Sequence, residues 1–102
     1  MDSVAMLITQ SYEEDSIGQM IAKDENKREI PIHIKAITRS EFYSAGQAGI
    51  TPEFIFLTAA VNYNNEKVIE FCGNRYSVYR VYNVPESDEV ELYLQKASGV
   101  TV

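Results

Sequence analysis

The feature that most constrains the fold is an alternation of apolar and polar residues, which recurs in short runs along the chain. In Arg28–Thr38, for example, Ile30, Ile32 and Ile34 alternate with residues that are mostly polar. A period of two is typical of a β-strand with one buried face. Because turn-forming residues separate the runs, the sequence predicts an all-β fold, a small β-barrel or sandwich of six to seven short antiparallel strands.

The length of 102 residues predicts one domain spanning residues 1–102. The strands are expected at Val4–Gln10, Ile17–Lys23, Arg28–Thr38, Glu53–Tyr63, Val68–Cys72, Arg75–Tyr82 and Glu89–Lys96. Polar segments separate several of them, notably a break at Ser11–Ser16 and a turn at Asp24–Lys27. Gly73-Asn74 has the chemistry of a two-residue hairpin turn. Residues 97–102 are expected to form a loose tail.

The segment Arg39–Pro52 interrupts the alternation in mid-chain. Ser40 is suited to cap a short helical turn through Ala45, and Gly46 is expected to end it. The residues after Gly46 then predict a flexible run. A loop of this length in a compact domain is usually functional.

Composition and charge disfavour several classes of function. The net charge is −6 and Lys and Arg do not cluster, which argues against tight nucleic-acid binding. No stretch approaches the ~20 apolar residues that span a bilayer, and the start lacks the pattern of a signal peptide, so we expect a cytoplasmic product with no membrane partner.

Candidate catalytic and metal-binding residues are scarce. His33 is the single histidine, in an alternating strand, and a nucleophile system would depend entirely on it. Cys72 is the single cysteine, which suits a small buried hydrophobe in a strand. The sequence therefore predicts no enzyme, no catalytic residue, no metal site and no cofactor.

Aromatic residues indicate an interaction surface. The strand Glu53–Tyr63 is apolar on both faces, so its second face needs a cover, either from this chain or from another subunit. Tyrosine and arginine recur on the later strands, and both residue types are enriched at protein interfaces. The residues expected at a subunit or partner interface are Phe54, Phe56, Tyr76, Tyr79, Arg80, Tyr82 and Tyr93.

Four local motifs, in their order and spacing, carry a resemblance to a known family. They are EFY-x-A at Glu41–Ala45, Y-N-x-E at Tyr63–Glu66, G-x-x-Y-x-V-Y-R at Gly73–Arg80 and E-L-Y at Glu91–Tyr93. From about Arg39 to Lys96 the chain resembles the head–tail joining, or head-closure, proteins of long-tailed bacteriophages.

The resemblance implies a β-barrel that assembles as a ring below the portal and its adaptor, with a mid-chain loop from each subunit that closes the DNA exit channel and a lower face that receives the tail. The location implied is the virion, after synthesis in the host cytoplasm. The channel-gating residues implied are Ser44, Ala45, Gly46, Gln47, Ala48, Gly49 and Ile50. The residues expected to anchor the loop are Glu41, Phe42, Tyr43 and Pro52.

Two alternatives stay open. One is an adaptor or tail-completion protein of the same junction. The other is a cellular SH3-like barrel that docks a peptide on Tyr76, Tyr79 and Tyr82.

Overall fold

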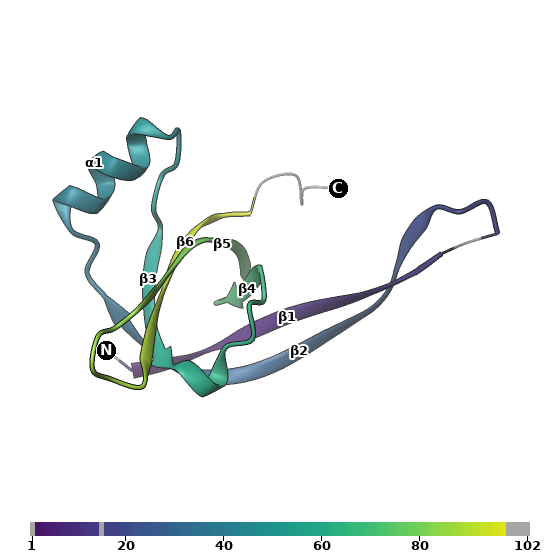
Figure 1. Ribbon diagram of the computed structural model, residues 1–102, viewed down its shortest axis with the longest axis horizontal. Coiled ribbons are helices and arrows are strands. Elements are labelled where there is room, and N and C mark those ends of the chain that lie inside the picture. The colour runs from purple at the N-terminus through teal and green to yellow at the C-terminus, as the bar shows by residue number, and fades with distance from the viewer. Residues whose placement is uncertain (1, 15, 98–102) are drawn as a thin grey trace.

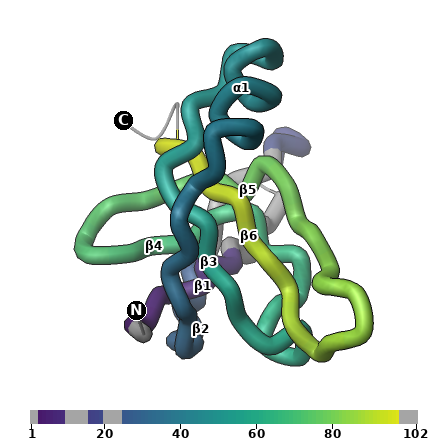
Figure 2. Tube along the Cα trace, turned by 90° about the vertical axis from the view of Figure 1, so that its left-hand side faces the viewer, coloured from purple at the N-terminus to yellow at the C-terminus, as the bar shows by residue number. Residues whose placement is uncertain are grey.

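The computed structural model describes residues 2–14 and 16–97, and the side chains of these except at 2, 10–14 and 20–24. The expected all-β fold is confirmed: six antiparallel strands close a barrel in the order β1-β2-β3-β6-β5-β4 (Figures 1 and 2). In chain order the elements are β1 (Asp2–Glu14), β2 (Met20–Lys35), α1 (Arg39–Gln47), β3 (Phe54–Ala59), the 3₁₀ turn η1 (Ala60–Asn62), β4 (Val68–Phe71), β5 (Asn74–Asn83) and β6 (Glu89–Lys96). The tail expected at 97–102 lies outside the described residues from 98 onward.

The core fills the barrel interior, and every strand contributes one face to it. As the alternation predicts, Ile30 and Ile32 are buried whereas Pro31 and His33 are exposed. The buried cluster comprises Ala5, Leu7, Ile30, Ile32, Phe56, Ile69, Phe71, Tyr76, Val90, Leu92 and Leu94. Four aromatic rings meet within it, those of Phe54, Phe56, Phe71 and Tyr76, with centroids 5.0–5.5 Å apart and mostly edge-to-face.

The β1–β2 hairpin extends well beyond the barrel (Figure 1). β1 pairs with β4 only at Met6–Ile8, and β2 pairs with β3 only at His33–Lys35. Residues 9–14 and 16–26, here named the arm, therefore have no third strand beside them within the described part of the chain. The arm makes the molecule elongated, with extents of 48 × 30 × 25 Å. It lies at the opposite end of the long axis from α1 (Figure 1).

The arm overturns two sequence expectations. β2 is continuous through Asp24–Lys27, so the turn expected there is wrong, and β1 continues through Ser11–Glu14, where a polar break was expected. The physical reason is that a strand that covers a core must place apolar residues on its inner face, and a run of polar residues cannot do so. Outside the barrel both faces of the hairpin can be polar, because the main-chain ladder alone fixes its conformation.

The turn between β4 and β5 also differs from its expected position. Phe71 pairs with Asn74, so the two connecting residues are Cys72 and Gly73 rather than Gly73 and Asn74. Their φ angles are +52° and +80°, as in a type I′ turn. Cys72 is exposed and its thiol is free, so the expectation of a buried cysteine is wrong.

This turn gives the first testable prediction, which concerns Cys72→Asn. A left-handed conformation at a residue other than glycine is strained, and asparagine tolerates it far better than cysteine. We expect Cys72→Asn to raise the free energy of unfolding by about 0.5–1 kcal/mol in urea titrations. Cys72→Val is the matched control, because a β-branched residue fits this conformation worst and should destabilise. Equal stabilities for the two variants would contradict the strained turn.

Candidate functional site

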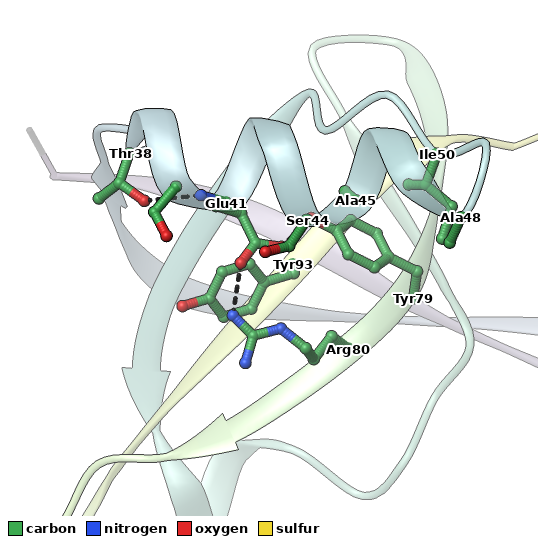
Figure 3. Close-up of a pocket in the computed structure, with 10 residues that line it drawn as sticks. Thr38, Glu41, Ser44, Ala45, Ala48, Ile50, Tyr79, Arg80 and Tyr93 are labelled. Atoms are coloured by element: carbon green, nitrogen blue, oxygen red, sulfur yellow. Dashed lines mark hydrogen bonds and ion pairs between the residues drawn. The ribbon is translucent and has the colours of Figure 1, made fainter.

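Helix α1 covers the outer face of the barrel where β5 and β6 run together (Figure 3). Thr38 is its N-cap, since Thr38 Oγ1 accepts a hydrogen bond from the Glu41 N–H at 3.1 Å. Ser40, the cap expected from the sequence, lies inside the helix. Threonine and serine are both good caps, so composition alone does not distinguish these two positions.

The helix ends at Gln47 rather than before Gly46, and the glycine that follows its C-cap Ala48 is Gly49. The Gly49 and Ile50 N–H groups donate to the Gly46 and Ala45 carbonyls, and Gly49 has φ +79°, which together form a Schellman motif. Gly46 lies in the last helical turn, where a glycine costs only about 1 kcal/mol. The flexible run expected from Gly46 is therefore helical through Gln47.

Glu41 connects the helix to the barrel. Its carboxylate accepts hydrogen bonds from the Tyr79 hydroxyl and from Arg80 Nη2, both at 2.6 Å (Figure 3). Arg80 also lies over the Tyr93 ring, 4.0 Å from its centroid. Glu41, Tyr79 and Arg80 are here named the clasp. Burial and the bond to Glu41 raise the pKa of the Tyr79 hydroxyl, so this proton stays on the phenol at neutral pH.

A second polar group lies beside the clasp on the same outer face. Glu91 is only 7% exposed, and it accepts hydrogen bonds from Lys35 Nζ and, at 2.7 Å, from the Tyr93 hydroxyl. Burial and the bond to Glu91 raise the pKa of Tyr93 to about 12. Because Arg80 stacks on Tyr93, the two groups form one network that joins β2, α1, β5 and β6.

A groove of about 610 Å³ lies between α1 and the barrel. It is lined by Thr38, Ser40, Glu41, Ser44, Ala45, Ala48, Ile50, Tyr79, Arg80 and Tyr93. Its one carboxylate is already paired with a guanidinium and a phenol. Such an arrangement is suited to holding one element reversibly against another, because each bond can be exchanged for a bond to water or to a partner.

Two of the four expected loop anchors are held against the rest of the molecule, and two are not. Glu41 contacts the barrel and Pro52 is buried. Phe42 and Tyr43 are 47% and 71% exposed, so these two rings do not hold the segment on the barrel. Among the expected gating residues, Ala45 is buried, Ile50 is half-buried and the others are exposed.

Most of the expected interface residues lie inside the molecule. Phe56 and Tyr76 belong to the buried core, and Phe54 is half-buried and packs against it. Their strands alternate as expected, but the face that they occupy is the inner one. Tyr93 is buried and Tyr79 is half-buried, which leaves Arg80 and Tyr82 exposed.

The chain itself covers only part of the second face of the doubly apolar strand: Ile55 is buried, Leu57 and Ala59 are half-buried, and Val61 is 84% exposed. Ile55 lies on the outer face of β3, directly opposite Tyr93 of β6, and both are buried in the single chain. The helix formed by the mid-chain segment lies over the same Tyr93 (Figure 3). Of the two covers left open by the sequence, the intramolecular one accounts for this burial.

The sequence reasoning missed Lys35, Thr38 and Glu91. Lys35 and Glu91 each occupy an outward position in an alternating strand, and their opposite charges were the available signal. Their meeting depends on β3 lying between β2 and β6, an order that the sequence pattern does not specify.

Among the described residues, no three His, Cys, Asp or Glu side chains are grouped so that they could hold a metal ion. No helix in this part of the chain is long and apolar enough to cross a membrane. Neither models of known protein families nor curated proteins match the chain. The function proposed below therefore rests on the resemblance of residues 39–96 to head-closure proteins, together with the geometry and charge of the molecule.

The paired carboxylates predict a loss of stability in acid. Burial raises the pKa of Glu66 and of Glu91, but the hydrogen bonds and ion pairs of each carboxylate, led by those from Arg28 and Lys35 respectively, together outweigh it, so both pKa values lie below the usual 4.5. A depressed pKa in the folded state stabilises the fold at pH values above 4.5, and this contribution is lost as the pH falls through the lowered values.

We expect the free energy of unfolding in urea to be level near neutral pH and to decline below about pH 4.5. The Glu91→Gln variant should show a shallower acid decline, because one of the two titrating groups is gone. An identical acid slope in the variant would contradict the role of Glu91.

Proposed function

We propose that this protein is a structural connector of a long-tailed bacteriophage particle. It assembles as a ring below the portal and its adaptor, closes the DNA exit channel with the segment Ser44–Ile50 and provides the docking surface for the tail. The protein then acts in the virion after synthesis in the host cytoplasm, and it passes DNA without sequence-specific binding.

The observation that carries the proposal is the attachment of α1. A gate needs an element with two positions, and such an element must be held by contacts that can be released. The polar hold on α1 comes through Glu41, while Ala45 is its one buried residue. The gating element is therefore a short helix with a glycine joint at Gly49, and in this proposal it swings as a unit.

The net charge and the closed barrel support the same function. The net charge of −6 suits the wall of a DNA conduit, because a basic wall would retain the duplex. The barrel is closed, so it offers few free strand edges for subunit association. Contacts in a ring would then fall on the projecting elements, which are α1 and the arm.

The two alternative functions differ in how well they fit the exposed residues. An adaptor or tail-completion protein of the same junction would use the same projecting elements. A peptide-binding SH3-like module would need its tyrosines exposed in one strip. Tyr76 is buried in the core, which counts against that reading.

The test is affinity purification with mass spectrometry during infection or prophage induction, with the tag at the C-terminus of the protein so that α1 and the arm stay unmodified. We expect the tagged protein to recover portal, adaptor and tail proteins, and an unrelated tagged protein from the same lysate to recover none. Recovery of host proteins alone would overturn the connector function.

A further inference from the structure

The β2 strand exposes a free edge outside the barrel. β1 occupies one side of β2 throughout, whereas β3 reaches the other side only from His33. Thr58 extends this contact to Pro31, because its hydroxyl donates to the Pro31 carbonyl at 2.8 Å. Within the described residues, the side of β2 from Met20 to Ile30 therefore has no strand beside it. An open edge of this length is a template for another strand.

The charges along this edge are self-complementary. Residues 23–29 read KDENKRE, with three positive charges, three negative charges and Asn26 at the centre. If a second copy of the strand runs antiparallel with Asn26 opposite Asn26, then Glu25 is opposite Lys27 and Asp24 is opposite Arg28. Each of these positions then meets one of opposite charge, and twofold symmetry makes each pair occur twice. Arg28 also pairs with Glu66 of its own chain, at 2.7 Å. Opposite charges directly across a strand pair stabilise it, and like charges destabilise it.

The contacts within one chain extend this pattern. Arg75 donates two hydrogen bonds to the Glu25 carboxylate, of 2.5 and 2.9 Å. Lys27 Nζ lies 2.9 Å from Glu70 Oε1. Glu25 and Lys27 lie on the same face of β2, since they are two residues apart. In the paired strands a row of alternating charge therefore runs from Arg75 and Glu25 of one copy to Lys27 and Glu70 of the other. These internal bonds also brace the base of the arm, so the edge is presented in a fixed position.

Accessibility is consistent with such a contact. Residues 25–29 are all exposed, and the pairing would end at Pro31, which has no N–H to donate. A bulge in the β1–β2 ladder leaves Lys23 without a register partner on β1, so the regular part of the edge begins at Asp24.

We propose that two copies of this chain associate through their β2 edges, antiparallel and with Asn26 on the twofold axis. The contact adds the strand of one copy to the sheet of the other, so that one sheet continues across both barrels. It is a property of the free protein and does not rest on the connector function.

The test uses the axis residue, because only Asn26 faces itself in this arrangement. Asn26→Glu places two carboxylates opposite each other, and Asn26→Lys places two ammonium groups there. Each variant alone should dimerise about fivefold more weakly than the unmodified chain in sedimentation velocity experiments. An equimolar mixture of the two variants should recover the dimer, as a heterodimer with Glu opposite Lys. The matched control pair is Asn83→Glu and Asn83→Lys, at an exposed asparagine on β5.

Each outcome of this experiment either supports the dimer or contradicts it. Recovery in the Asn26 mixture, with no effect at Asn83, supports the proposal. An unmodified chain that stays monomeric up to millimolar concentration overturns it, as does a dimer that neither Asn26 variant weakens or that the mixture fails to recover. Amide hydrogen exchange on the unmodified chain gives a check that needs no variant. Residues 24–28 should gain protection as concentration rises, and unchanged protection there would also overturn the pairing.

Discussion

Replacing Phe56 with alanine is expected to lower the free energy of unfolding by about 3–5 kcal/mol. Phe56 has no exposed surface, and its ring contacts those of Phe54 and Phe71 with centroids 5.5 and 5.0 Å away. Its removal deletes one ring of the aromatic cluster and leaves a cavity that the closed barrel cannot collapse around. Since small domains are stable by only about 5–15 kcal/mol, the variant should be partly unfolded near physiological temperature.

Phe42→Ala is the matched control for this prediction. The same chemical change is made at a ring on α1 that is 47% exposed, so we expect the free energy of unfolding to change by less than about 0.5 kcal/mol. Urea unfolding followed by circular dichroism measures both variants. Comparable losses for the two would mean that Phe56 does not occupy the core and would restore it as an interface residue.

Replacing Glu41 with alanine is expected to release α1 from the barrel without unfolding the barrel. The change removes the carboxylate that accepts hydrogen bonds from Tyr79 and from Arg80. The bond from Tyr79 is partly buried, and the bond from Arg80 joins two charged groups. We expect the free energy of helix opening to fall by about 2 kcal/mol, so that amides in α1 exchange about thirtyfold faster. Amides in β6 should keep their protection, because the core beneath is untouched.

Two variants control this experiment. Glu41→Gln keeps a carbonyl oxygen for the Tyr79 hydroxyl but loses the charge that pairs with Arg80, so an intermediate rate is expected. Ser40→Ala changes a neighbouring residue that lines the same groove, and it should leave exchange in α1 within about 0.5 kcal/mol of the original. Equal exchange rates in Glu41→Ala and Ser40→Ala would show that the clasp does not hold the helix.

The sequence was most informative where a strand has one face on the core. At Ile30 and Ile32 the alternation is dictated by burial, so pattern and structure agree. It was least informative for the arm, where Asp24–Lys27 carry the composition of a turn although they form a strand. Composition reports contact with a core, and no arm residue whose side chain is described belongs to the buried core. The strands of the arm are fixed by main-chain hydrogen bonds between β1 and β2, which leave little trace in the residue pattern.

The candidate site was predictable only in part. The sequence predicts a helical turn ending at Ala45 and predicts Glu41 as a loop anchor, and Glu41 does contact the barrel. Its partners, Tyr79 and Arg80, are distant in sequence, and a bulge in the β5–β6 ladder between Val78 and Arg80 shifts the register there. A shift of one residue exchanges the faces of a strand. The side on which Tyr79 and Arg80 emerge therefore did not follow from alternation.

The pairing between β1 and β4 has a consequence for the order in which the chain folds. It consists of three residue pairs, from Met6–Glu70 to Ile8–Val68, and it joins the most distant neighbouring strands of the barrel. The β1–β2 and β4–β5 hairpins join nearby segments and can form early, because their loops are short. The three residue pairs between β1 and β4 can form only after the intervening strands have folded and brought β4 next to β1. We therefore expect closure of the barrel between these two strands to be the late, rate-limiting event in folding, and its reopening to be the first step of unfolding.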